Sequence, residues 1–252
     1  MKLIINIFFF SHIGKKYILL FMKIKGFIGT SLLDYPKKIC SIIFLAGCNF
    51  KCPFCQNPDL IGSANHIKTI PLTDIIDELK IRKNFIEGVV ISGGEPTIYN
   101  NLEEIILPIK RLDYSIKIDT NGYNPELIEE LIRKKIVDYV AMDIKTSFDR
   151  YNEAAGCRVN IEKLKKTIEI IKKYANDYEF RTTVVPTLIN EEDIKKIAKE
   201  CSGAKAYYLH QYRSIITFDK SYQKIEPYDV SQLIYFKKIL LSKIPNVQIR
   251  GL

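Results

Sequence analysis

Apolar runs alternate with amphipathic segments along most of the chain, from about residue 39 to residue 209. Short runs rich in Val, Ile and aromatic residues are typical of buried strands, whereas apolar residues every three to four positions are typical of helices with one buried face. The pattern predicts strands at 40–45, 88–92, 115–119, 137–142, 179–185 and 204–209. Between them it predicts helices at 72–84, 101–111, 125–134, 160–174 and 191–200.

Alternation of strands and helices predicts a mostly parallel sheet covered by helices. Six such units place the chain in the α/β class and predict a partial (β/α)6 TIM-like barrel, not a closed eightfold one. Residues 22–38 are expected to form an N-terminal hairpin, and 230–241 and 247–250 a last helix and a short strand. Because 252 residues are enough for one large core, we expect a single domain over residues 22–252.

The first 21 residues form a poorly patterned extension. Their apolar runs, 3–10 and 17–21, are separated by two lysines. Neither run reaches the ~20 residues needed to span a bilayer, and no small-residue cleavage site follows. A second methionine, Met22, begins the better-patterned sequence. We therefore expect residues 1–21 to be an over-extended start or an appendage, and neither a signal peptide nor a membrane anchor.

The formal net charge of +9 favours an acidic partner, a nucleotide-like cofactor or nucleic acid. The lysines, however, recur on predicted helices such as 161–173, where they are typical of the solvated face of an amphipathic helix. No compact basic stretch interleaved with aromatic residues appears, so we expect no nucleic-acid partner.

Three of the 6 cysteines, Cys48, Cys52 and Cys55, stand at CxxxCxxC spacing directly after the first predicted strand. Three thiolates at this spacing can bind three irons of a cubic [4Fe-4S] cluster, which leaves the fourth iron open for chemistry. Gly47 and Pro53 favour a turn whose backbone amides can point at the sulfur atoms. The loop therefore predicts a reactive iron–sulfur centre.

Zinc is the alternative metal that such thiolates could bind. Structural zinc sites are closed by four ligands and are usually built from CxxC pairs, and no fourth ligand lies nearby in the sequence. The nearest histidine is His66, and the isolated cysteines are Cys40, Cys157 and Cys201, which are expected to be small buried hydrophobes. A non-catalytic iron–sulfur or zinc module stays open as an alternative.

Reduced thiolates predict a cytoplasmic protein, because the cytoplasm keeps cysteine thiols reduced.

Three further polar motifs follow the next three predicted strands. They are Gly-Gly-Glu-Pro at 93–96, Asp-Thr-Asn-Gly at 119–122 and Asp-Ile-Lys at 143–145. The carboxyl ends of parallel strands meet at one edge, where sites of α/β proteins are built. Asp143 and Lys145 alternate along one strand and so share a face, which is also the pattern of a buried ion pair. We expect these motifs and the cysteine loop to surround one mouth.

Together these motifs resemble those of radical S-adenosylmethionine (SAM) enzymes. More narrowly, the chain is similar to activating enzymes of glycyl-radical enzymes, such as pyruvate formate-lyase and anaerobic ribonucleotide reductase, over residues 22–215. The resemblance implies an anaerobic oxidoreductase in which Cys48, Cys52 and Cys55 bind a [4Fe-4S] cluster whose open iron binds SAM. One electron then splits SAM into methionine and a 5′-deoxyadenosyl radical, which abstracts hydrogen from a glycine of a partner enzyme.

The resemblance also implies which residues contact SAM. Phe54, Cys55 and Gln56 of the cysteine loop would lie against the cofactor, and the backbone of Gly94 would receive the methionine amino group. Core packing is the alternative role of Phe54. Further SAM contacts are expected from Asp119, Asp143, Ile144 and Lys145, and from either His210 or Gln211 at the end of the sixth strand.

The carboxylates and Lys145 would bind the ribose hydroxyls and the carboxylate of SAM, or a monovalent cation that neutralises that carboxylate. No catalytic acid or base is expected, because the step is a radical transfer. The implied partners are a glycyl-radical enzyme as protein substrate and a low-potential electron donor of the flavodoxin or ferredoxin type. No membrane partner is expected.

Two observations bear on the substrate. The leader at 26–36 resembles activating enzymes proposed to serve anaerobic ribonucleotide reductase. Only residues 56–79 lie between the cysteine loop and the second strand unit, so the eight-cysteine insert of some activating enzymes is missing there. A radical SAM enzyme that acts on a small molecule or a nucleoside stays open as the second reading.

Overall fold

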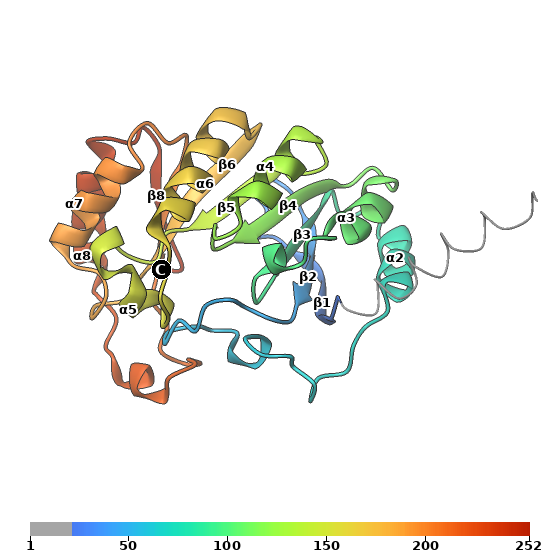
Figure 1. Cartoon of the computed structure of the whole chain (residues 1–252), viewed down its shortest axis with the longest axis horizontal. Helices are drawn as coiled ribbons and strands as arrows, with labels where there is room; N and C mark the ends of the chain where they lie inside the picture. The colour runs from blue at the N-terminus through green and yellow to red at the C-terminus, as the bar shows by residue number, and fades with distance from the viewer. Residues whose placement is uncertain (1–21) are drawn as a thin grey trace, which may run out of the picture.

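A computed structural model describes residues 22–252 of the chain (Figure 1). The predicted extension at 1–21 lies outside the described residues. The strands are β1 (Ile24–Ser31), β2 (Cys40–Leu45), β3 (Gly88–Gly93), β4 (Ser115–Thr120), β5 (Tyr139–Asp143), β6 (Asp177–Val184), β7 (Tyr207–Gln211) and β8 (Val247–Arg250). The helices are α2 (Leu72–Ile81), α3 (Glu103–Lys110), α4 (Pro125–Arg133), α5 (Tyr151–Ala155), α6 (Ile161–Tyr174), α7 (Glu191–Glu200) and α8 (Val230–Leu241).

All eight strands form one sheet in the order β1 to β8. Strand β1 runs antiparallel to β2, and every later pair is parallel. Six strand–helix units, from β2 with α2 to β7 with α8, precede the last strand. The α/β partial barrel predicted from the sequence is therefore confirmed, with β1 and β8 added at its two edges.

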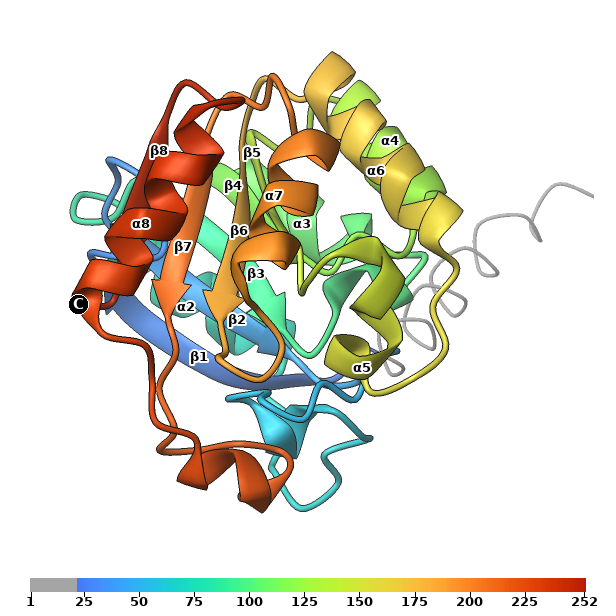
Figure 2. The same ribbon diagram turned by 90° about the vertical axis from the view of Figure 1, so that its left-hand side faces the viewer.

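The helices lie on the outside of the curved sheet, as Figure 2 shows for α4, α6, α7 and α8. The central strands are buried on both faces, and the residues of β3 from Val89 to Ile91 are fully inaccessible. Continuous apolar strands are typical of parallel sheets covered by helices. Helix α4 packs an apolar stripe of Leu127, Ile128 and Leu131 against this core.

Polar side chains at the N-caps fix where several helices begin. Asn124, Asn160 and Asp229 accept hydrogen bonds from backbone amides of α4, α6 and α8, and Asn190 forms a capping box with Asp193 at α7. Such caps satisfy amides that have no partner inside the helix, and each stabilises the helix by about 1 kcal/mol. These helices begin within one residue of their predicted starts.

The predicted hairpin within residues 22–38 is wrong. This segment contributes only β1, and the second arm of the hairpin is β2. After β1 the chain forms bends and a turn, in which Lys37 adopts a left-handed backbone conformation with φ of 63°. A residue with positive φ does not continue a strand, so no second strand forms before Cys40.

Strand β7 begins three residues later than predicted. Residues Cys201 to Ala204 form a turn, in which the Ala204 amide donates to the Cys201 carbonyl and Gly203 has a φ of +73°. As a result His210 and Gln211 are the last two residues of β7, not residues that follow it.

Strand β8 is tied to the sheet interior by a buried ion pair. The Arg250 guanidinium donates to both carboxylate oxygens of Glu179 on β6, at 2.7 and 2.8 Å, across the intervening β7. Such a two-pronged pair is stronger and more directional than a single bond. Within residues 22–252, no helix combines the length and the apolar composition that crossing a membrane requires.

Candidate functional site

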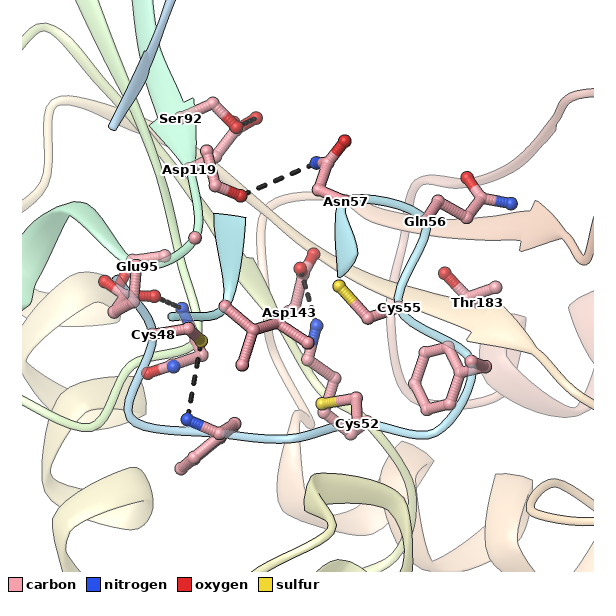
Figure 3. Close-up of a pocket in the computed structure, with 18 of the residues that line it drawn as sticks. Cys48, Cys52, Cys55, Gln56, Asn57, Ser92, Glu95, Asp119, Asp143 and Thr183 are labelled. Carbon is pink, nitrogen blue, oxygen red and sulfur yellow. Dashed lines mark hydrogen bonds and ion pairs between the residues drawn. The ribbon is translucent and has the colours of Figure 1, made fainter. Parts of the chain in front are cut away.

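The carboxyl ends of the parallel strands surround a cavity of ≈ 320 Å³ (Figure 3). The cysteine loop after β2, the glycine turn after β3 and the ends of β4 to β7 all contribute to its lining. Predicted site residues that line it are Cys48, Cys52, Phe54, Cys55, Gln56, Gly94, Asp119, Asp143, Lys145 and His210. The structure thus brings together residues that are up to 162 positions apart in the sequence, from Cys48 to His210.

Two predicted residues do not line the cavity. Ile144 is buried at 1% exposure in the hydrophobic core, and its backbone carbonyl accepts a hydrogen bond from Thr182. The side-chain amide of Gln211 donates to the Tyr228 carbonyl. The Oε1 atom of Gln211 is buried without a partner among the described residues, but neither Gln211 nor Ile144 lines the cavity, which therefore offers no support for their predicted SAM contacts.

All three cysteines of the loop are free. Burial raises the pKa of Cys48 to about 12 and that of Cys52 to about 11, and it also raises the pKa of Cys55. Buried thiols of this kind lose their protons when a metal takes the place of the proton, because the positive charge then stabilises the thiolate.

The three cysteines can hold an iron–sulfur cluster. No three His, Cys, Asp or Glu side chains within residues 22–252 converge into a ready site for one metal ion. In a cubic cluster each thiolate binds a different iron, so the thiols surround the cube instead of meeting at one ion. The three thiols line the same cavity from one loop, as Figure 3 shows, so the donor set suits the predicted [4Fe-4S] cluster.

Backbone hydrogen bonds hold the cysteine loop on several sides. The bonds are Gly47 N to Leu60 O (2.7 Å), Cys48 N to Ile61 O (2.9 Å), Lys51 N to Ala155 O (2.8 Å) and Asp219 N to Pro53 O (2.9 Å). The amide of Phe50 also points at the Cys48 sulfur, 3.4 Å away. Amides directed at sulfur stabilise the thiolate and tune a bound cluster.

The glycine turn packs directly on the start of the cysteine loop. A Cβ atom on Gly94 would lie 2.0 Å from the Gly47 carbonyl oxygen, closer than any real contact. Its neighbour Gly93 has a φ of +124°, which only glycine adopts without strain. The turn therefore requires glycine at both positions, and both glycines also line the cavity.

Glu95 connects this turn to the turn after β4. Its buried carboxylate accepts hydrogen bonds from the Thr97 amide and hydroxyl, the Thr120 hydroxyl and the Asn121 amide. The side chain of Asn121 then donates to Asn49 of the cysteine loop at 2.7 Å. Glu95 and Asn121 both stand in the strand-end motifs, but neither was predicted as a site residue.

We expect Asn121→Ala to loosen the cysteine loop, because it removes the only side-chain bond from the β4 turn to Asn49 among the described residues. Loss of one such bond costs about 1 kcal/mol of unfolding free energy. The bound cluster should also be lost faster to an iron chelator, followed by its visible absorbance. Asn100→Ala, at an exposed turn, is the matched control. Equal loss rates in the two variants would contradict this role.

A network of charged side chains lines the cavity, with Asp119, Asp143, Lys145 and Arg181 among its members. The Lys145 ammonium lies 2.9 Å from Asp143, and Arg181 of β6 bonds to both Asp143 and Asp119. Lys117 pairs with Asp119 from below. Burial by itself raises the pKa of Asp119 and Asp143, but Arg181 and the two lysines outweigh it and hold both below their ordinary values.

These carboxylates are therefore ionised at neutral pH. Asp143 and Lys145 form the ion pair that was the alternative reading of their motif, and both also line the cavity. Arg181 was not predicted as a site residue. Its partners come from β4 and β5, which a single sequence does not place beside it.

His210 has an unsatisfied nitrogen in the cavity lining. Among the described residues, none offers a hydrogen-bond partner to its buried Nε2. Burial, and after it the nearby Arg181 charge, lower the pKa of His210 to about 4, so the imidazole is neutral at pH 7. A buried polar atom without a partner costs free energy, and a bound polar ligand would satisfy it.

Two other sequence expectations have clear outcomes. Phe54 is 5% exposed, packs in the core and also lines the cavity, so both of its proposed roles are compatible with its position. Cys40 and Cys201 are fully buried as expected, whereas the expectation is wrong for Cys157. Cys157 is half-buried, and its thiol lies 3.6 Å from the Asn49 carbonyl of the cysteine loop.

A family model described as the radical SAM superfamily matches residues 42–201. The chain is 39% identical to "Putative glycyl-radical enzyme activating enzyme MJ1227" of Methanocaldococcus jannaschii, over 90% of this chain and 95% of that protein. It is 30% identical to the pyruvate formate-lyase-activating enzyme of Clostridium pasteurianum, over 66% of this chain and 71% of that enzyme.

Solved structures show the same fold. SuiB of Streptococcus suis, bound to its precursor peptide SuiA, superposes with a TM-score of 0.66 at 18% identity, over 83% of this chain. The chain spans 48% of the SuiB chain. A domain of a pyruvate-formate lyase-activating enzyme from Bacteroides vulgatus superposes with a TM-score of 0.53 at 19% identity, over 66% of this chain and 99% of that domain. At such identities the likeness shows the fold alone.

Proposed function

Because the chain belongs to the radical SAM superfamily and, within it, to the glycyl-radical enzyme activating enzymes, we propose that it generates a glycyl radical on a partner enzyme. The observation that carries this proposal is the single cavity shared by the three cysteines, the Gly94 turn, the Asp143–Lys145 pair and His210. This arrangement supports a cluster bound beside a SAM site.

The chain's residues would divide the work as follows. Cys48, Cys52 and Cys55 would hold a [4Fe-4S] cluster, which supplies the electron for reductive cleavage of SAM. The backbone at Gly94, which lines the cavity, would receive the amino group of SAM. The Lys145 ammonium would attract the SAM carboxylate, with its position held by Asp143.

Lys145 and Arg181 already supply positive charge near the place proposed for the SAM carboxylate. Arg181 and Lys145 neutralise Asp143, so a monovalent cation would have to compete with both of them for the same oxygens. We therefore favour Lys145 over a bound cation in this role. Catalysis would rest on proximity, because the substrate carbon must lie next to the nascent 5′-deoxyadenosyl radical with water excluded.

The shape of the sheet supports a protein substrate. Strands β1 and β8 stand at opposite ends of the strand order, and no ladder joins them among the described residues. A barrel that is not closed leaves a side through which a loop of another protein can reach the cavity. The leader at 26–36, which resembles activating enzymes for anaerobic ribonucleotide reductase, supports that enzyme as the partner.

His210 is our choice over Gln211 as the contact to the adenosyl group, because only His210 lines the cavity. His210→Ala should raise the dissociation constant of SAM about fivefold, which corresponds to the loss of one hydrogen bond of about 1 kcal/mol. Gln211→Ala should leave the dissociation constant of SAM within about twofold of the wild-type value. Equilibrium dialysis with the reconstituted protein measures both constants, and the reverse order would assign the contact to Gln211.

The test of the function is the radical itself. Anaerobically reconstituted protein, SAM and dithionite are incubated with an anaerobic ribonucleoside-triphosphate reductase of the same organism, and the reductase is examined by electron paramagnetic resonance. We expect a glycyl radical that disappears when its glycine is replaced by alanine. SAM cleavage without any such radical would favour the small-molecule reading. That reading has some support from 36% identity to a 7-carboxy-7-deazaguanine synthase of Aquifex aeolicus over 32% of this chain.

A further inference from the structure

A loop after β7 exposes three large apolar side chains close together. Ile215, Ile216 and Phe218 are 79%, 54% and 45% exposed. Single exposed apolar residues are common on protein surfaces, but three within four positions are not explained by packing. We call residues 213–218 the apolar loop.

The apolar loop rests on the cysteine loop. Asp219, directly after it, donates its amide to the carbonyl of Pro53 at 2.9 Å, and Gln56 donates its side-chain amide to the carbonyl of Arg213 at 3.2 Å. Pro53 and Gln56 stand next to the ligands Cys52 and Cys55. The apolar loop therefore lies against the part of the chain that carries two of the three thiols.

This surface is separate from the cavity. No residue of the apolar loop lines the cavity in which the SAM groups converge. In Figures 1 and 2 the orange segment after β7 and the cyan segment after β2 project from the same side of the sheet, the side toward which β6 and β7 point. The cysteine loop thus has one face toward the cavity and another toward the apolar loop.

Basic residues slightly outnumber acidic ones in the two segments that form this surface. Across residues 51–59 and 213–226, four exposed basic side chains accompany three exposed acidic ones. The basic ones are Lys51, Arg213, Lys220 and Lys224, and the acidic ones are Asp59, Asp219 and Glu226. With the net charge of +9 of the whole chain, this favours approach of an acidic partner.

We propose that the apolar loop and its basic surroundings form the docking surface for an acidic one-electron carrier protein that reduces the cluster. This rests on the proposed function and names the place where its reductant binds. An apolar centre with a charged rim is the usual anatomy of a transient interface, and opposite charge speeds the encounter. The reduced carrier loses one electron to the cluster, and no bond forms or breaks in this step.

The carrier fits this surface better than the substrate enzyme does. A substrate glycine has to enter the cavity, whose lining excludes the apolar loop. An electron carrier has to come close to the thiolates, since electron transfer slows steeply with distance, and the hydrogen-bonded contact at Pro53 provides a short path to them.

The test compares two reductants on the same reconstituted holoenzyme. The variant Ile215→Ser/Ile216→Ser and the wild type are assayed for 5′-deoxyadenosine, once with dithionite and once with photoreduced acidic flavodoxin or ferredoxin. Since loss of a central apolar anchor weakens an interface about tenfold or more, we expect KM for the carrier to rise by that factor. The dithionite rate should be unchanged. Ile81→Ser, equally exposed at 79% but at the far end of α2, is the matched control and should change neither rate.

Each other outcome overturns the proposal. An unchanged KM for the carrier removes the docking role. A normal carrier KM with poor activation of the partner enzyme, under dithionite as well, would assign the surface to the substrate. A change in molecular mass by light scattering would assign it to a second copy of the chain. Failure of the proposed function is distinct, since it appears in the wild type as absent SAM cleavage or an absent glycyl radical.

Discussion

Cys52→Ser should reduce formation of 5′-deoxyadenosine at least about a hundredfold. It removes a proposed ligand of the cluster, and even the loss of an indirect support of a metal ligand costs about 10–100-fold. Serine has the size of cysteine but binds iron poorly, so the fold of the loop is retained. Cys52 is 7% exposed and its neighbours Lys51 and Pro53 are held by backbone bonds to Ala155 and Asp219, which supports a folded variant. Iron and sulfide analysis after anaerobic reconstitution, with product formation, checks both effects.

Cys157→Ser is the matched control for this experiment. Its thiol lies beside the cysteine loop, 3.6 Å from the Asn49 carbonyl, yet it stands outside the CxxxCxxC triplet. The control should retain full iron content and activity. A Cys52→Ser protein that keeps its iron and its activity would show that another side chain is the ligand, and Cys157 would then be the first candidate.

Gly94→Ala should weaken SAM binding and also destabilise the fold. The added Cβ would lie 2.0 Å from the Gly47 carbonyl oxygen and 2.9 Å from that of Leu60, so backbone segments on both sides have to move. Forcing extra atoms into packed structure costs about 1–3 kcal/mol of unfolding free energy. Gly47 immediately precedes Cys48, so the same shift displaces the cysteine loop. We expect at least about a tenfold increase in the dissociation constant of SAM, which corresponds to 1.4 kcal/mol or more.

Gly62→Ala separates this effect from the general consequences of adding a methyl group. A Cβ on Gly62 meets no other atom within 4 Å, and its backbone does not have positive φ. Its thermal unfolding midpoint and its SAM affinity should match those of the wild type. Equal affinity for SAM in the Gly94 and Gly62 variants would contradict the placement of SAM at the glycine turn.

The sequence was sufficient to predict the parallel strands and their helices, because hydrophobic periodicity and N-cap residues are local signals. It failed where long-range pairing decided the outcome. Residues 22–38 carry strand-like character, but the partner of β1 is β2 and not a strand within the same segment. The late start of β7 depends on the turn at Gly203, whose left-handed conformation the apolar pattern does not reveal.

Some features of the candidate site could be predicted from the sequence, and others could not. The cysteines and the motifs at strand ends were visible as spacings, and the parallel topology brings them to one edge. The connections between them were not visible, because Glu95 and Asn121 act through partners on other strands. The role of Arg181 likewise becomes visible only in the fold, where β6 lies beside β5 and Arg181 bonds to the carboxylates of Asp119 and Asp143. His210 was separated from Gln211 by the direction of its side chain alone.

The most direct test of the central claim is the product of SAM under reducing conditions. Protein purified and reconstituted without oxygen, then mixed with dithionite and SAM, should yield 5′-deoxyadenosine and methionine in equal amounts, measured by liquid chromatography. The yield should depend on iron and sulfide and be lost in Cys52→Ser. A protein that binds one zinc and no iron, or that holds the iron–sulfur cluster and forms no 5′-deoxyadenosine, would contradict the account.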